Sequence, residues 1–123
     1  MFVPSLGYLI LFVCSPEKSA HFYSQLFNLK PIQQSLTFVL FALPGGVMLG
    51  LWSKETAEPK VTAQAGSSEI CFSADTIDEL YEEWAKKRIS IAQKPIDMDF
   101  GRTFVALDPD GHRIRIYHLH GEN

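Results

Sequence analysis

The chain has 123 residues and a formal net charge of −3, with 46% hydrophobic and 20% charged residues. This length suits one ordinary domain with a real core, and the composition excludes a disordered chain. The small negative charge, with no basic run, argues against nucleic acid and anionic membrane as partners.

The first apolar run, from Leu6 to Cys14, is predicted to be a buried strand. It is too short to span a bilayer as a helix, and no Lys or Arg precedes Lys18, so the charged start of a signal peptide is missing. Cys14 and Cys71 make no disulfide framework. Each lies in an apolar segment, which predicts two buried, reduced thiols in a cytoplasmic protein.

A helix is predicted to follow this strand. Ser15 suits the N-cap, Pro16 suits the first turn, and Glu17 suits the positive end of the helix dipole. A short strand is expected near residues 31–34, followed by a hairpin "FALPGGVMLGLW" whose turn is Gly45-Gly46.

The same order of elements recurs about 61 residues later in "EICFSADTIDELYEEWAKKR". Thr76 and Glu79 form a capping-box pattern at the start of the second predicted helix. Its apolar stripe, which should lie on a sheet with the tryptophan in the core, consists of Ile77, Leu80, Tyr81, Trp84 and Ala85. A strand near 89–93 and the closing hairpin "VALDPDGHRIRIY" complete this copy.

The two hairpins match when Gly46 is aligned with Gly111, which sets Gly50 against Arg115. The sequence therefore predicts an α+β fold of two tandem units, 1–60 and 61–123, each in the order strand, helix, strand, strand, strand, in one domain. Such units curl a mixed sheet into a cup with the helices on its convex face.

Two segments carry a family resemblance: "FVCSPEKSAHFY" and "FGRTFVALDPDGHRIRIY". They resemble the glyoxalase / bleomycin-resistance / extradiol-dioxygenase superfamily, also called vicinal oxygen chelate proteins, over essentially the whole chain. With "LW" at 51–52, the ending is most similar to small antibiotic-binding members such as the phenazine-resistance proteins. The resemblance also implies a homodimer.

Metalloenzymes of this superfamily carry metal ligands at positions that the resemblance assigns to Tyr8, Gly50, Glu69 and Arg115. Only Glu69 is an ordinary ligand, because glycine has no side chain and a guanidinium cannot donate an electron pair to a metal. We therefore expect no metal and no other cofactor, with Arg115 in the metal's place and paired with Glu69. The alternative is an arginine at the rim in solvent and an unpaired Glu69.

Catalytic groups are not evident in the sequence. No arrangement of a Ser or Cys nucleophile with histidine can be argued from the residue order, and no glycine-rich phosphate loop is present. His118 and His120 share a strand face near the C-terminus, where a solvated tail is expected rather than a metal site.

An aromatic ligand surface is predicted instead. Tyr8, Ile10 and Phe12 alternate inward on one strand, as do Met48, Gly50 and Trp52 on another. The missing side chain at Gly50 should let a flat molecule approach the sheet and stack on Trp52, although Trp52 equally suits packing in the core or at a dimer interface.

Other aromatic residues could extend this wall, among them Phe38, Phe41, Phe100, Phe104 and Tyr117. Arg102 could contact the ligand at the mouth of the cup, brace a turn or lie in solvent. The complete set of candidate ligand-binding residues is Tyr8, Phe12, Met48, Gly50, Trp52, Glu69, Phe100, Arg102, Arg115 and Tyr117.

The favoured function is metal-free binding and sequestration of a planar, mostly apolar small molecule, with antibiotic resistance as one use. One alternative is a metal-dependent enzyme with atypical ligands, either a glyoxalase-like lyase or isomerase or a ring-cleaving dioxygenase. A second alternative is a regulatory module that binds a partner protein and no small molecule.

Overall fold

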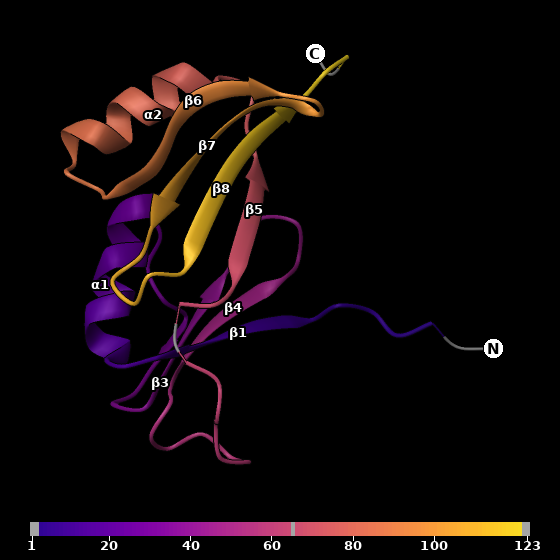
Figure 1. The fold of residues 1–123 in the computed structure, drawn as a ribbon. Coiled ribbons are helices and arrows are strands. Elements are labelled where there is room, and N and C mark those ends of the chain that lie inside the picture. The colour runs from indigo at the N-terminus through magenta and orange to yellow at the C-terminus, as the bar shows by residue number, and fades with distance from the viewer. Residues whose placement is uncertain (1–2, 65, 122–123) are drawn as a thin grey trace. The chain divides into compact units, whose positions relative to one another are not determined.

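The computed structural model describes residues 3–64 and 66–121. The chain forms two compact units, Met1–Ala65 and Gly66–Asn123, which we call the N-terminal unit and the C-terminal unit. The sequence pattern had suggested a border at residue 60, within the loop that follows the last strand of the N-terminal unit. Figure 1 shows a helix beside the strands of each unit.

The N-terminal unit contains one helix and one mixed sheet. Its elements are β1 (Tyr8–Val13), α1 (Pro16–Phe27), β2 (Gln33–Gln34), β3 (Phe38–Ala42) and β4 (Met48–Ser53). The strand order is β1-β4-β3-β2, with β1 parallel to β4 and the other neighbours antiparallel. The predicted cap of α1 is confirmed, because the Lys18 amide donates a hydrogen bond to Ser15 Oγ at 3.2 Å.

The C-terminal unit repeats this arrangement. Its elements are β5 (Glu69–Ser73), α2 (Ile77–Lys86), β6 (Ile91–Met98), β7 (Gly101–Leu107) and β8 (Arg113–Leu119). The strand order is β5-β8-β7-β6, with β5 parallel to β8. The two units therefore have the same topology, which confirms the internal repeat and the mixed α+β class.

The core of each unit lies between its helix and one face of its sheet. In the N-terminal unit, Leu11, Leu49, Leu51 and Phe41 are fully buried together with Tyr23 of α1. Phe41 is thus a core residue and not part of a ligand wall. Successive strand residues point to opposite faces, so the residues between these leucines lie on the other face of the sheet.

In the C-terminal unit, Ile114, Ile116 and Phe104 are buried against α2. The Phe104 ring centroid lies 5.4 Å from that of Trp84, which is 2% exposed, so the predicted core role of Trp84 is confirmed. Ala85 differs from the prediction and is exposed, because the buried stripe of α2 is narrower than the sequence suggested.

The start of α2 also differs from the prediction. Thr76 occupies the N-cap position, but its side chain makes no capping hydrogen bond. The first turn of α2 is instead bonded to the sheet, because Arg102 of β7 donates two hydrogen bonds of 2.9 Å to the carboxylate of Asp78. The acidic first turn thus has a cationic partner in addition to the helix dipole.

The two cysteines were predicted to be buried, and this is wrong. Both Cys14 and Cys71 are exposed, and neither belongs to a disulfide. Cys71 alternates with Ile70 along β5, and only Ile70 points into the core. An apolar run marked the strand correctly, but a strand with one covered face exposes every second residue.

A search of residues 3–64 and 66–121 finds no helix of the length and apolar character that crossing a membrane requires.

Candidate functional site

Aromatic side chains form one row on the face of the N-terminal sheet that points away from its core. Phe12, Trp52 and Phe38 are paired across β1, β4 and β3 in register. The Trp52 ring centroid lies 6.2 Å from those of both phenylalanines, tilted by 34° to Phe12 and nearly perpendicular, at 87°, to Phe38. Trp52 is only half-buried, so this row, which we call the aromatic face, is accessible.

Gly50 lies in the next row of the aromatic face, between Ile10 of β1 and Leu40 of β3. A Cβ atom placed on Gly50 would lie 2.6 Å from Ile10 Cδ1 and 2.9 Å from Phe38 Cζ. Neighbouring side chains therefore already cover the glycine backbone. The expectation that Gly50 leaves bare sheet for a flat molecule is corrected: Gly50 lets the side chains beside Trp52 close over it.

Tyr8 and Met48 form the following row and end the aromatic face. Tyr8 is 56% exposed and Met48 is half-buried. The pairing confirms that the two predicted inward sets, from β1 and β4, share one face.

Charged side chains cluster on the corresponding face of the C-terminal sheet. Glu69 of β5 accepts hydrogen bonds from Arg115 of β8, at 3.0 Å from Nε to Oε2 and 3.4 Å from Nη2 to Oε1. Arg113 lies on β8 two residues before Arg115, and its Nε is 2.9 Å from Glu69 Oε1. We call these three residues the arginine–glutamate cluster. The predicted pairing of Arg115 with Glu69 is confirmed, and Arg113 is an additional partner.

Burial differs across the cluster. The side chain of Arg115 is 14% exposed, that of Glu69 is 32% exposed and that of Arg113 is 51% exposed. Arg115 Nη1 also donates to Thr103 Oγ1 at 3.3 Å, and the fully buried Thr103 hydroxyl donates to the Ile116 carbonyl at 2.6 Å. Arg115 is therefore fixed by two strands, whereas Arg113 reaches into solvent.

The cluster changes the acidity of its members. The hydrogen bond from Arg115 and the charges of both arginines hold the pKa of Glu69 below its ordinary value, against the opposing effect of burial. Cys71, whose thiol lies 3.6 Å from Glu69 Oε2, has a raised pKa, first because of desolvation and then because of the neighbouring carboxylate. Its thiol therefore stays protonated at neutral pH.

Three other predicted residues lie elsewhere on the C-terminal sheet. Tyr117 is half-buried and follows Arg115 on the same face. Phe100, in the turn before β7, is 41% exposed. Arg102 lies on the opposite face, where it binds Asp78 and, through Nη1 at 3.1 Å, Asp97. Of the three roles considered for Arg102, bracing is the one that these contacts support.

The four positions that the resemblance assigned to metal ligands do not suit a divalent cation. Gly50 offers no side chain, and Arg115 offers only donors. Both oxygens of Glu69, the one ordinary ligand, face guanidinium groups. A cation at this carboxylate would meet two positive charges at hydrogen-bond distance.

Within residues 3–64 and 66–121, one other group of side chains has the composition of a metal site: Asp108, Asp110 and His112, with ligand atoms within 4.8 Å of one another. Asp108 accepts hydrogen bonds from the amides of Asp110 and His112, at 2.9 and 2.8 Å, and its second oxygen lies 2.8 Å from His112 Nδ1. The Asp108 carboxylate thus organises the turn between β7 and β8.

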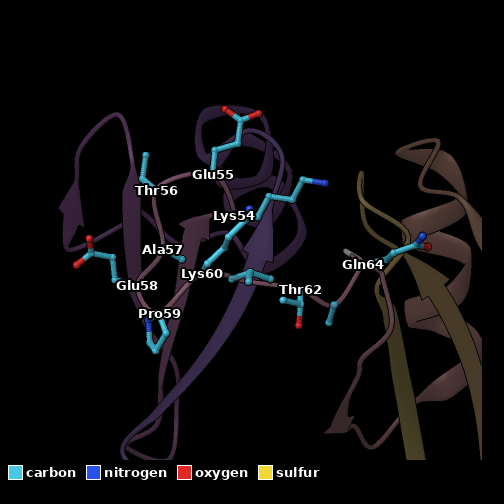
Figure 2. Close-up of a pocket in the computed structure, with 11 residues that line it drawn as sticks. Lys54, Glu55, Thr56, Ala57, Glu58, Pro59, Lys60, Thr62 and Gln64 are labelled. Carbon is cyan, nitrogen blue, oxygen red and sulfur yellow. The ribbon is translucent and has the colours of Figure 1, made fainter.

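A concavity of about 1210 Å³ lies in the loop after β4 and is lined by residues 54–64. Figure 2 shows that Lys54, Glu55 and Glu58 point in different directions and do not converge on one point. None of the predicted ligand-binding residues lines it. A binding pocket needs a few convergent polar groups on an apolar wall, which this loop lacks.

Three residues around the candidate surfaces were missed or left undecided by the sequence analysis. Arg113 and Thr103 were given no role. Phe38 was considered without a direction, and its pairing with Trp52 now fixes it on the aromatic face. The alternating Arg-Ile-Arg-Ile run was the available signal for Arg113, because it puts both arginines beside the same strand.

Comparison with known proteins gives one family. Residues 5–116 match the family model of the Glyoxalase/Bleomycin resistance protein/Dioxygenase superfamily. The chain is 33% identical over 113 residues to the phenazine antibiotic resistance protein EhpR of Enterobacter agglomerans. The matched region covers 87% of this chain and 86% of that protein.

Solved structures agree with this match. The protein ATC0852 from Agrobacterium tumefaciens is 38% identical and superposes with a TM-score of 0.83, over 97% of this chain and 100% of that one. A glyoxalase/bleomycin resistance protein/dioxygenase from Nocardioides has the same TM-score of 0.83 at 21% identity, over 100% of this chain and 89% of that one. The second likeness concerns the fold alone.

Proposed function

The chain belongs to the Glyoxalase/Bleomycin resistance protein/Dioxygenase superfamily, and on this premise we propose that it binds and sequesters a planar, mostly apolar small molecule without a metal ion. Sequestration needs no bond to be broken, only a surface with sufficient affinity and a protein concentration above that of the ligand.

The observation that carries this proposal is the half-buried Trp52 between Phe12 and Phe38. Aromatic rings stack with offset or edge-to-face geometry, and such a contact is worth about 0.5–1.5 kcal/mol beyond the area that it buries. A tryptophan whose only task was core packing would be buried like Trp84, which is 2% exposed. The free part of the indole is the surface that we assign to the ligand.

Similarity to a phenazine antibiotic resistance protein supports a tricyclic aromatic ligand of the phenazine class. Such a molecule offers a flat π-face to the aromatic face and few groups that need hydrogen bonds. Antibiotic resistance by sequestration is then the biological use that we propose.

The chemistry of the arginine–glutamate cluster supports binding without a metal. Glu69 is engaged by two guanidinium groups, so it would have to lose both partners to ligate a cation. A lyase, isomerase or dioxygenase that uses a metal would lack its ligands at Gly50 and Arg115. Two exposed cysteines that form no disulfide support a reducing compartment, the cytoplasm.

Titration of the purified protein with phenazine, followed by quenching of tryptophan fluorescence, tests the proposal directly. We expect saturable quenching with one site per chain, unchanged by EDTA, and elemental analysis with less than stoichiometric zinc, nickel, iron or manganese. Absence of saturable binding would contradict the ligand class. One equivalent of a transition metal that EDTA removes together with binding would instead favour the metal-dependent enzyme.

We further propose that the protein acts as a homodimer. Within the described residues, 3–64 and 66–121, the strands β1 and β5 each lie at the edge of a sheet, with one side of the backbone without a neighbouring strand in its sheet. Unpaired edges of this kind favour association with a second chain. Light scattering at micromolar concentration should give twice the mass of one chain, and a monomeric mass would contradict the proposal.

A further inference from the structure

The four strands of the N-terminal sheet carry no charged side chain. Their sequences are YLILFV, QQ, FVLFA and MLGLWS, all within the described residues, and none contains Asp, Glu, Lys, Arg or His. The aromatic face therefore offers a ligand no ionic partner from its strands. An ionised group that loses water there would meet no opposite charge, which favours a neutral ligand.

Gln33 of β2 lies on the aromatic face, at the margin farthest from β1. It pairs in register with Leu40 of β3, and Leu40 pairs with Gly50 of β4. Residues that pair in register share a face of the sheet, and Leu40 alternates with the fully buried Val39 and Phe41 of the core face. The side chain of Gln33 is therefore on the same face as Trp52.

Gln34, the other residue of β2, belongs to the opposite face. It lines a concavity of about 690 Å³ beside α1, together with charged and polar residues of the helix that include Glu17, Lys18 and His21. Adjacent residues of a strand point to opposite faces, so this position of Gln34 supports the placement of Gln33. One strand thus presents one amide to the helix and one to the uncharged aromatic face.

The backbone around Gln33 is fixed to β3, whereas its side chain is available. The Ile32 amide donates to the Leu40 carbonyl at 2.8 Å, and the Ser35 amide donates to the Phe38 carbonyl at 2.9 Å. Gln33 is exposed, and its side-chain amide has no hydrogen-bond partner within the part of the chain that the structure describes. It therefore offers two N–H donors and one carbonyl acceptor from a strand whose position is set.

We propose that Gln33 determines ligand specificity and that the planar ligand carries a neutral hydrogen-bonding group, such as a carboxamide, which the Gln33 amide binds. This inference rests on the proposed function and narrows it to uncharged aromatic molecules with one polar end. A carboxamide matches the glutamine side chain, because each supplies both a donor and an acceptor.

The spacing of the strands suits a tricyclic ligand. Neighbouring strands lie about 4.8 Å apart, so β2 is about 10 Å from β4, which carries Trp52. Three fused rings that stack on Trp52 and extend over Phe38 cover most of this span. A polar group at the far end of the rings then comes within reach of Gln33.

Three ligands test the inference: phenazine, phenazine-2-carboxamide and phenazine-2-carboxylate. A substituent at position 2 extends from the end of the ring system and lies clear of the ring nitrogens. One hydrogen bond should make the carboxamide bind the unaltered protein about fivefold more tightly than phenazine. The carboxylate should bind no more tightly than phenazine, because the strands supply no cation to offset its loss of water.

The variant Gln33→Met keeps the length of the side chain and removes its amide. It should bind the carboxamide no better than phenazine and bind phenazine as before. Gln34→Met is the matched control, since it makes the same change on the opposite face of the same strand, and it should keep the preference for the carboxamide.

Equal binding of the carboxamide and phenazine by the unaltered protein would overturn the inference and leave the proposed function standing. The same holds if the carboxylate binds most tightly, if Gln33→Met keeps the preference, or if Gln33→Met and Gln34→Met lose it equally. If none of the three ligands binds, the proposed function fails and the inference fails with it.

Discussion

Arg115 and Glu69, which are 46 residues apart in the sequence, are joined by two hydrogen bonds of 3.0 and 3.4 Å between neighbouring parallel strands. The same carboxylate also holds Arg113 at 2.9 Å. The three partners do not depend on each other equally. Arg115 is largely buried, and Glu69 is the carboxylate that balances its charge. Glu69 itself has a second cationic partner in Arg113, and the exposed Arg113 side chain is also hydrated by solvent.

This asymmetry predicts unequal effects on stability. Glu69→Leu should lower the free energy of unfolding by about 2–3 kcal/mol, because it leaves the buried Arg115 without its carboxylate and beside a second cation. Arg115→Met should lower it by only about 1 kcal/mol, because Glu69 keeps Arg113. Denaturant unfolding of the two single variants measures both values.

The double variant with both changes tests whether the pair is coupled. Its loss should be smaller than the sum of the single losses by about 0.5 kcal/mol or more, because a pair replaced by apolar groups leaves no unmatched charge. Arg113→Met serves as the control and should stay within about 0.5 kcal/mol, as is usual for an exposed ion pair. Additive losses in the double variant would mean that the hydrogen bonds contribute no net stability.

Acid should weaken the fold through two carboxylates in the C-terminal unit. Hydrogen bonds from Arg115 and Arg102, respectively, lower the pKa values of Glu69 and Asp78. A lowered folded-state pKa contributes stability that is complete above the unfolded-state values of about 4 and is lost as the pH falls through the folded-state values.

The melting temperature of the unaltered protein should therefore fall steeply below about pH 4, while that of the double variant Glu69→Gln, Asp78→Asn should fall less over the same range. The variant starts from a lower melting temperature at pH 7, so the slopes are compared and not the absolute values. Glu82→Gln, at an exposed position of α2, is the matched control and should keep the steep slope. Parallel curves for all three proteins would count against this account.

Cys71 should be a slow nucleophile despite its exposure. Desolvation and the neighbouring Glu69 raise its pKa, so little thiolate forms at pH 8. In a Cys14→Ser background, Glu69→Gln removes the carboxylate and leaves both arginines, which favour the thiolate. Alkylation of Cys71 by iodoacetamide, followed by mass spectrometry, should become about threefold faster or more.

The rate at Cys14, measured in a Cys71→Ser background, is the internal reference and should not respond to Glu69→Gln. An equal acceleration at both cysteines would indicate general loosening of the fold instead of a local change in acidity.

The repeat was the part of the fold that the sequence predicted best. Aligning Gly46 with Gly111 placed corresponding hairpins together, and the two sheets have equivalent strand orders, β1-β4-β3-β2 and β5-β8-β7-β6. Alternation in the Arg-Ile-Arg-Ile run of β8 separates the buried Ile114 from Arg115, because side chains on a strand point to opposite faces. The partner of Arg115 came from the family resemblance, since no local pattern connects it to a residue 46 positions away.

The errors arose where a contact depends on neighbouring strands. Cys71 was predicted to be buried from its apolar segment, but the register of β5 turns it outward. Gly50 was expected to expose backbone, but the side chains of Ile10 and Phe38, from two other strands, fill the space. The direction of Arg102 depends on which face of β7 it occupies, and a shift of one residue exchanges the faces.

Trp52 should carry much of the affinity for a planar ligand. Trp52→Ala should weaken phenazine binding about tenfold or more, since stacking and lost buried area together exceed about 1.4 kcal/mol. Trp52→Phe should bind with an intermediate affinity, because it keeps a smaller ring between Phe12 and Phe38. Because Trp52 is half-buried, the fold should survive both changes, which circular dichroism and melting temperature would verify.

The second tryptophan provides the contrast. Trp84 is 2% exposed and packs on Phe104, so its emission should not respond to ligand, and Trp84→Phe should leave the affinity unchanged. Unchanged affinity in Trp52→Ala would assign Trp52 to packing alone.

Gly50 offers a test of how the aromatic face is packed. A methyl group at this position would lie 2.6 Å from Ile10 Cδ1 and 2.9 Å from Phe38 Cζ, both of which are ends of side chains. Gly50→Ala should therefore lower the free energy of unfolding by about 1 kcal/mol, the lower end of the cost of overpacking, because these ends can move.

Ile10→Val removes the Cδ1 atom that lies nearest to the added methyl group. In that background Gly50→Ala should cost nothing or stabilise the strand, because alanine restricts the unfolded chain more than glycine. Denaturant unfolding of the four proteins gives the coupling between the two positions. If Gly50→Ala costs the same with isoleucine and with valine at position 10, the side chain of Ile10 does not cover Gly50, and the backbone there is open to a ligand after all.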